Sequence, residues 1–93
     1  MSKIGPFWVS YDPRADVLYI NLRREESARG LEDARGIVWR YGDDGKVIGI
    51  TLLDFRYLSL PQKAALADEI SLRFHVPHEQ VSEAIELGSR EAA

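Results

Sequence analysis

The sequence predicts a small α+β protein, in which a mostly antiparallel, four-stranded meander sheet precedes two helices that pack on one of its faces. Three observations predict this class. The first half of the chain carries short runs of β-branched and aromatic residues. The pair Asp44-Gly45 separates two of these runs, which is typical of a hairpin. The second half has apolar residues at helical spacing after a capping signal.

The composition is that of a single globular domain. The chain has 93 residues, of which 45% are hydrophobic and 29% charged, and it has no cysteine. We expect one domain over 1–93, with the sheet in 6–57, a helical hairpin in 59–88 and a frayed tail in 89–93. The missing cysteines exclude disulfide scaffolds, thiolate zinc sites and cysteine nucleophiles.

The first predicted hairpin joins the runs Pro6–Tyr11 and Val17–Leu22 through the turn Asp12–Asp16. Asp and Pro favour such a turn, because Pro fixes one torsion and Asp side chains bond the nearby backbone. The register stays open, since Tyr11 can pair with either of the first two residues of the second run and both faces are apolar. A short edge strand at Leu31–Ala34 is a further candidate.

The second predicted hairpin joins Ile37–Tyr41 to Val47–Leu53. A type I′ turn with Asp44 and Gly45 at its tip sets the pairing of the two runs. This register places six apolar side chains on one face, as the pairs Ile37 with Leu52, Trp39 with Ile50, and Tyr41 with Ile48. A shift by one residue would bring Trp39 beside Thr51 and break that face.

Two helices are predicted in the second half. Ser59 and Gln62 fit a capping box, and Pro61 falls in the first turn, where its missing N–H is tolerated. Pro77 can begin the second helix, and Gly88 is a plausible stop. The buried stripes predicted for the two helices are Leu66, Ala67, Ile70 and Phe74, then Val81, Ala84, Ile85 and Gly88.

Charge is distributed unevenly along the chain. Twelve Lys and Arg against fifteen Asp and Glu give a net charge of −3. Segment 59–93 carries this whole excess. We therefore expect no nucleic-acid partner. The sequence has no targeting signal and no apolar run long enough for a membrane, so we expect a cytoplasmic protein.

The chemistry-bearing residues do not form a catalytic set, so a non-enzymatic role is favoured. His75 and His78 are separated by Pro77, which disfavours a shared metal site on one helix face. Neither has a triad context, and we expect no cofactor or metal. A DNA-binding second helix is disfavoured because its charges are acidic. The arginines fit a solvated, salt-bridged rim better than an anion or RNA site.

The carboxylates of the first turn are the candidates for a ligand site, although a turn that satisfies its own backbone is the simpler interpretation. Aromatic neighbours and a third carboxylate complete the set of possible ligand or interface residues, which are Asp12, Asp16, Tyr19, Trp39 and Asp54.

Two stretches carry a family resemblance. They are Tyr11–Ile20, which reads YDPRADVLYI, and Gly36–Asp54, which contains DDGKVIGI. Over residues 9–57 the chain resembles the domain-of-unknown-function family 2283 of small prokaryotic proteins. The resemblance implies an antiparallel sheet and no particular activity. Thr51 stands where the family usually has Glu, and Arg40 and Tyr41 stand where it often has acidic residues.

Two functions remain as hypotheses. The first is a homodimeric protein-interaction module, because two short helices cannot cover all the apolar groups of both sheet faces. Some proteins of this kind resemble antitoxins, so its second partner would be a small basic protein that binds the acidic C-terminal helix. The alternative is a small-ligand or substrate-binding protein with its site at the turn Asp12–Asp16.

Overall fold

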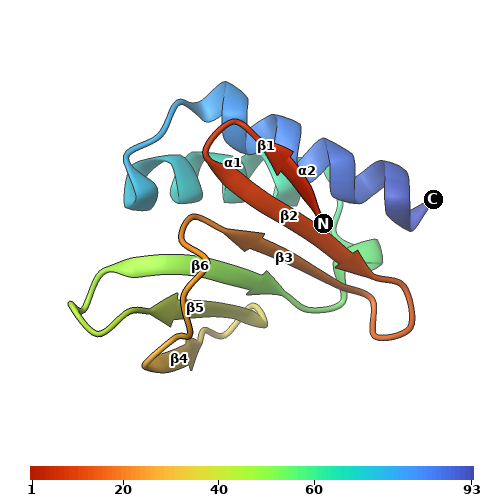
Figure 1. Cartoon of the computed structure of the whole chain (residues 1–93). Coiled ribbons are helices and arrows are strands. Elements are labelled where there is room, and N and C mark those ends of the chain that lie inside the picture. The colour runs from red at the N-terminus through yellow and green to blue at the C-terminus, as the bar shows by residue number, and fades with distance from the viewer.

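The computed structural model describes all 93 residues and has the predicted α+β class. Two helices, α1 (Leu60–Phe74) and α2 (His78–Ala92), lie on one face of an antiparallel sheet (Figure 1). A short 3-10 helix, η1 (Phe55–Tyr57), connects the sheet to α1. The sheet has the order β1-β2-β3-β6-β5-β4, and its strands are β1 (Ser2–Ile4), β2 (Phe7–Asp12), β3 (Val17–Asn21), β4 (Arg29–Glu32), β5 (Ile37–Tyr41) and β6 (Val47–Leu52).

The sheet has six strands, so the prediction of four is wrong. The strand without a prediction is β1, which pairs with β2 through Ile4 and Phe7. Gly5 takes a φ of 55° and, with Pro6, forms the two-residue turn between them. The weakly patterned edge strand β4 begins two residues earlier than the predicted Leu31–Ala34.

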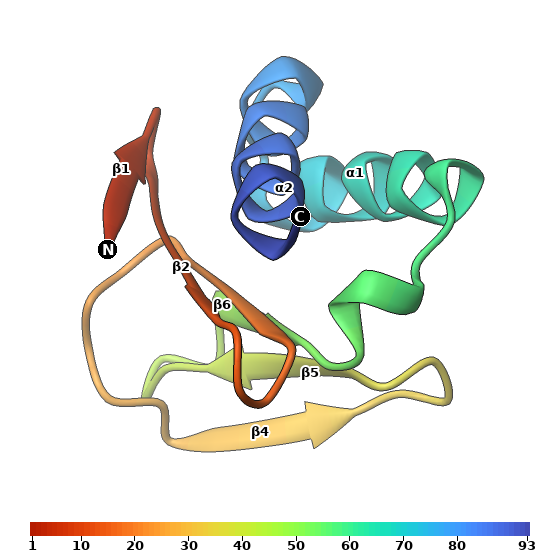
Figure 2. The ribbon, with the colours of Figure 1, turned by 90° about the vertical axis from the view of Figure 1, so that its right-hand side faces the viewer.

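The strand order also differs from a meander. After β3 the chain passes to the far edge of the sheet, forms β4, and returns through β5 to β6, which pairs with β3. Figure 2 shows the connection from β3 to β4 swinging wide of the sheet. The two predicted hairpins are therefore joined side by side through Ile20 and Ile50, which are direct partners.

The first hairpin adopts one of the two registers that the sequence allowed. Tyr11 pairs with Leu18, and Val9 pairs with Ile20. These four side chains then lie on the face that the helices cover, where Val9, Leu18 and Ile20 join the buried core. Burial against the helices thus selects between registers that local pattern could not distinguish.

The second hairpin follows the predicted register except at its tip. Ile37 pairs with Leu52 and Trp39 with Ile50, but Tyr41 pairs with Val47 because a bulge shifts the register after Arg40. The predicted type I′ turn is wrong, since it needs two residues with positive φ and only Gly45 has one, at 78°. Ile48 is buried but lies outside the main core cluster.

The helices bury the predicted stripes. The capping box of α1 is confirmed, because the Ser59 hydroxyl accepts from the Gln62 N–H and the Gln62 side chain accepts from the Ser59 N–H. The predicted stop at Gly88 is wrong, since α2 continues to Ala92 and includes most of segment 89–93. A Cβ on Gly88 would lie 2.7 Å from Leu18, so this glycine lets α2 approach the sheet closely.

One core cluster of sixteen buried residues fills the space between the helices and the sheet. Trp39 and Ile50 both belong to it, as do Phe7 and Phe74, whose ring centroids are 5.8 Å apart. Neither helix is long and apolar enough to cross a membrane. The opposite face of the sheet has no helix over it (Figure 2).

Candidate functional site

The two carboxylates of the first turn serve the fold. Asp12 Oδ1 accepts from the backbone N–H of Arg14 at 2.9 Å and of Ala15 at 3.2 Å. Asp16 has a φ of 56° and accepts from the Tyr11 hydroxyl at 2.7 Å and from the Arg56 N–H at 3.1 Å. It therefore fastens the turn to η1, and the turn interpretation of the sequence agrees with these bonds. None of the three cavities is lined by Asp12 or Asp16.

The remaining candidate residues lie apart from one another. Trp39 is buried in the core, where its Nε1–H donates to Asp33 at 3.2 Å and the Arg73 guanidinium lies 4.1 Å from its ring. Asp54 is exposed at the start of η1, near the same end of the sheet as Asp16. Tyr19 alternates with the buried residues Leu18 and Ile20, so it lies on the face that the helices leave uncovered. The structure thus brings together the turn carboxylates but not the whole set.

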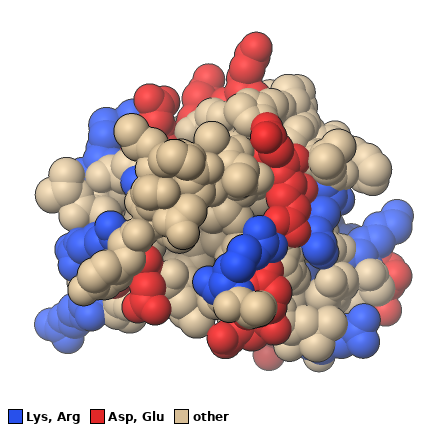
Figure 3. Space-filling view, turned by 180° about the vertical axis from the view of Figure 1, so that it is seen from behind, with Lys and Arg blue, Asp and Glu red and all other residues tan.

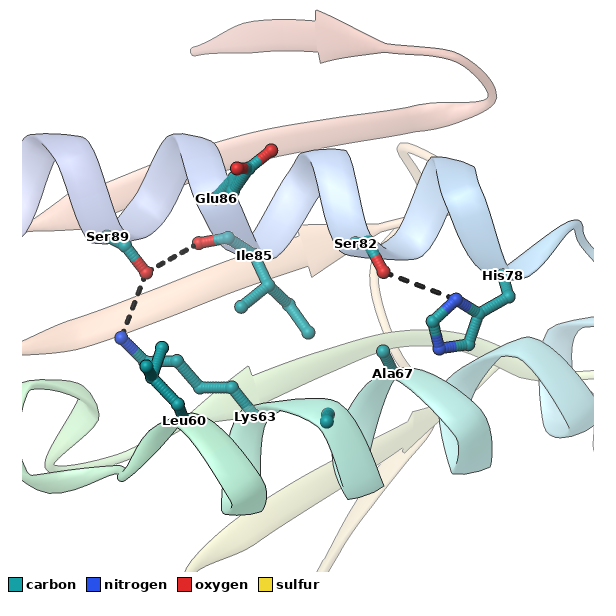
Figure 4. A pocket seen from close by; sticks show the side chains of 9 residues that line it. Leu60, Lys63, Ala67, His78, Ser82, Ile85, Glu86 and Ser89 are labelled. Atoms are coloured by element: carbon teal, nitrogen blue, oxygen red, sulfur yellow. Dashed lines mark hydrogen bonds between the residues drawn. The ribbon is translucent and has the colours of Figure 1, made fainter.

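A groove of about 260 Å³ lies between α1 and α2 (Figure 4). At one end, His78 Nδ1 is 3.3 Å from the Ser82 hydroxyl and His78 Nε2 is 2.9 Å from Asp68. This line of Asp, His and Ser has the composition of a catalytic triad. However, the Asp68 side chain is 71% exposed, whereas a triad holds its histidine with a buried carboxylate. No group of three or more His, Asp and Glu side chains is placed to hold a metal ion.

The arginines divide into two kinds. The predicted salt-bridged rim is correct for Arg23, which binds Asp44 at 3.0 Å, and for Arg35, which binds Asp33 and Glu69. These contacts raise the pKa of both guanidinium groups. The arginines without a carboxylate within 4 Å include four that lie in or beside the sheet, namely Arg24, Arg29, Arg40 and Arg56.

The uncovered face of the sheet consists of two rows of cross-strand neighbours. Alternation along each strand places these residues opposite the buried core residues. The first row runs from β1 to β4 as Lys3, Trp8, Asn21, Gly49, Arg40 and Gly30. The second row runs from β2 to β4 as Ser10, Tyr19, Thr51, Val38 and Glu32. None of these residues lines one of the three cavities.

Arg40 is the most unusual residue of the uncovered face. Its guanidinium lies over Gly49 and donates through Nη2 to the Asn21 side chain. Its Nε is buried and has no hydrogen-bond partner. Desolvation by burial lowers the pKa of this group. A half-buried cation with no carboxylate and an unsatisfied N–H is costly for an isolated chain, and it suits a face that meets another molecule.

Aromatic side chains occupy the β2 and β3 part of the same face. Trp8 is half-buried, with Lys3 Nζ and the Arg24 guanidinium each 4.6 Å from its ring centroid. Tyr19 is half-buried on the neighbouring strand β3, where it pairs with Ser10, two residues after Trp8. The face is therefore a partly apolar surface with three cations, Lys3, Arg24 and Arg40, and one acidic side chain, Glu32.

Sequence reasoning found Tyr19 but missed Trp8, Arg40 and Gly49 as parts of one surface. The register of the second hairpin already placed Arg40 and Gly49 on the face opposite Trp39. The pairing of β3 with β6, which no local pattern indicates, is what brings Trp8 and Asn21 beside them.

Comparison with known proteins identifies the family. No curated protein and no solved structure matches the chain. A family model described as a protein of unknown function (DUF2283) matches residues 8–56, which run from the start of β2 into η1 and leave out both helices. This match covers more than half of the chain and most of the uncovered face. The chain therefore belongs to the DUF2283 family of proteins of unknown function.

Proposed function

We propose that this protein is a non-enzymatic protein-interaction module that forms a homodimer through the uncovered face of its sheet. One observation carries the proposal: a six-stranded sheet has helices on one face only, and the other face presents Trp8, Tyr19 and the incompletely bonded Arg40. Aromatic residues and arginine are enriched at protein interfaces, whereas small ligands bind in concave sites, and no residue of this face lines a cavity.

The acidic residues of α2 are the basis for a second proposed contact, with a basic protein. Glu79, Glu83 and Glu86 lie on one face of α2, because their spacing brings them to neighbouring turns. All three are exposed and none takes part in an ion pair. Figure 3 shows acidic side chains projecting from the top of the molecule, where the helices lie in Figure 1. We propose that this surface binds a small basic protein, as an antitoxin-like partner would.

The two surfaces lie on opposite sides of the molecule, so a homodimer through the sheet leaves both α2 helices accessible (Figure 2). Nothing in the arrangement of the turn Asp12–Asp16 favours the alternative of a small-ligand site, because both carboxylates are occupied by the fold.

Size-exclusion chromatography with light scattering tests the homodimer. We expect a mass of twice the 10.5 kDa of one chain for the wild type and a monomer for Tyr19→Glu, which places a charge in the middle of the uncovered face. Tyr57→Glu is the matched control, because Tyr57 is 84% exposed and lies on η1, outside that face. A wild-type monomer at micromolar concentration would contradict the proposal.

Titration with a deca-arginine peptide, followed by NMR, tests the acidic surface. We expect chemical-shift changes centred on α2, and their loss when Glu79, Glu83 and Glu86 are all changed to Gln. A control variant that removes three exposed acids elsewhere, at Glu25, Glu26 and Asp43, should still bind. Equal binding by both triple variants would show that only net charge matters and would overturn this part of the proposal.

A further inference from the structure

We propose that the groove between α1 and α2 holds an apolar side chain of the basic partner, while carboxylates around the groove bind the partner's cations. The inference rests on the proposed acidic contact of α2 and adds an apolar anchor to it. It gives the partner a stated chemistry, which is a basic amphipathic helix whose apolar stripe enters a groove between two helices.

The groove offers apolar surface that the fold itself leaves open. Leu60 and Ala64 of α1 are exposed and line the groove together with Ile85 of α2. Figure 4 shows the Ile85 side chain pointing toward α1. Ile85 and Ala67 are buried and form the base of the groove, whereas Leu60, which is 79% exposed, forms its edge. Such an apolar hollow in a charged surface is typical of a contact with another molecule.

The size of the groove suits side chains of another protein. Its volume is about 260 Å³, below the range of about 300–1,000 Å³ that is usual for small-molecule sites. The apolar anchors of protein interfaces fill pockets of this kind, each with one or two side chains.

Carboxylates surround the groove. Asp68 lies at one end with its side chain 71% exposed, and His78 Nε2, at 2.9 Å, occupies one of its two oxygens. Glu86 lines the α2 wall. Like Glu79 and Glu83 on the same helix, it takes part in no ion pair. A partner with cations beside its apolar side chain therefore complements this rim.

The cations near the groove lie at its other end. Lys63 Nζ donates to the Ser89 hydroxyl at 2.9 Å and is 4.9 Å from the Phe55 ring centroid. Figure 4 shows Lys63 and Ser89 at the opposite end from His78, and Arg90 follows Ser89 along α2. The stem of Lys63 extends the apolar wall. We therefore expect the partner's cations at the His78 end.

Two peptides of equal charge test the apolar contact. One is a helical peptide with leucine at every third or fourth position and lysine elsewhere, and the other has glutamine in place of each leucine. We expect the wild type to bind the leucine peptide at least about tenfold more tightly in fluorescence anisotropy, because burial of one leucine contributes at least that factor. In NMR spectra, the leucine peptide should shift the methyl signals of Ala64, Ala67 and Ile85.

Variants separate the apolar contact from the charge. Leu60→Gln should remove the preference for the leucine peptide. Leu72→Gln is the matched control and should keep it, because Leu72 is 76% exposed on the same helix but does not line the groove. Asp68→Asn should weaken binding of both peptides alike, by about twofold to fivefold, since both carry the same cations.

The outcomes distinguish the groove from the acidic contact. Equal binding of the two peptides by the wild type, with deca-arginine still shifting α2, would overturn the groove and leave the acidic contact standing. A preference that survives Leu60→Gln, or that shifts the Trp8 indole in place of the groove methyl groups, would place the apolar contact elsewhere and overturn the inference. No binding of any of the three peptides would overturn both proposals.

Discussion

The guanidinium of Arg40 lies across strand β6 directly over Gly49, at the place where any other residue would carry its side chain. A Cβ on Gly49 would be 2.6 Å from Arg40 Nη2 and 2.7 Å from Asn21 Oδ1. The missing side chain thus lets an arginine on β5 reach an amide on β3, two strands away. This contact organises the uncovered face of the sheet.

Gly49→Ala should displace the Arg40 guanidinium and destabilise the fold by about 1 kcal/mol, the usual contribution of one hydrogen bond. Urea unfolding of the single variant, measured well below the dimer dissociation constant, checks this value. In an Arg40→Leu background the same change should cost less, because no guanidinium is left to displace and only the close contact with Asn21 Oδ1 remains. An equal cost in both backgrounds would show that Gly49 is needed for another reason.

Gly88→Ala should also destabilise the protein, by about 1–2 kcal/mol, despite the better helix propensity of alanine. The new Cβ would lie 2.7 Å from both Leu18 methyl groups, and Leu18 is fully buried in the core. Thermal unfolding measures the change. In a Leu18→Ala background Gly88→Ala should become stabilising, and a persistent loss there would contradict the packing explanation.

Asp16→Ala should cost about 2 kcal/mol, since it removes a charged acceptor from the Tyr11 hydroxyl and the Arg56 N–H and leaves alanine at positive φ. Asp16→Asn separates the loss of the charged acceptor from the backbone strain, because asparagine tolerates a positive φ. Tyr11→Phe should reproduce only part of the loss. Free energies of unfolding equal to the wild type for both Asp16 variants would show that the turn is not fastened to η1 by this carboxylate.

Acid stability should depend on Asp33. Burial alone would raise its pKa, but hydrogen bonds from Arg35, Trp39 Nε1–H and the Ile37 N–H lower it to about 2 from 3.8. A carboxyl whose pKa is lower in the folded state stabilises the protein above its unfolded pKa, and this contribution is lost as pH falls through about 4 to 2. The contribution is about 2 kcal/mol.

Unfolding measured across this pH range checks the effect. Asp33→Asn should flatten the acid limb of the stability curve between about pH 4 and 2 relative to the wild type. Asp43→Asn serves as the control, because Asp43 is an exposed turn residue without a bonded partner. A curve for Asp33→Asn that falls as steeply as the wild type would contradict the assignment.

The parts of the fold that depend on local chemistry could be predicted. The capping box at Ser59, the helical stripes and most of the second hairpin follow from contacts between residues close in sequence. The tip of that hairpin could not be assigned, because Asp-Gly fits both a type I′ turn and the turn with a bulge that forms here. Gly88 resembles a stop signal, and only the position of Leu18 shows that it is a packing residue.

The uncovered face could be predicted only in part, because it depends on long-range pairing. Alternation assigns Tyr19 and Arg40 to faces of their own hairpins. Tyr19 and Arg40 lie on one surface because β3 pairs with β6. That pairing buries Ile20 and Ile50 side by side under the helices. The net charge of −3 also concealed that this face has three cations, Lys3, Arg24 and Arg40, and a single acid, Glu32, while the excess acids lie in the helical half of the chain.

Isotope-filtered NMR on a mixture of labelled and unlabelled protein tests the central claim most directly, because it detects only contacts between two copies. The account predicts intermolecular NOEs from the Trp8 indole and the Tyr19 ring to the partner's uncovered face, and none from Trp39, which is buried in the core. A dimer whose intermolecular NOEs come only from α1 and α2, with Trp8 and Tyr19 still facing solvent, would contradict it.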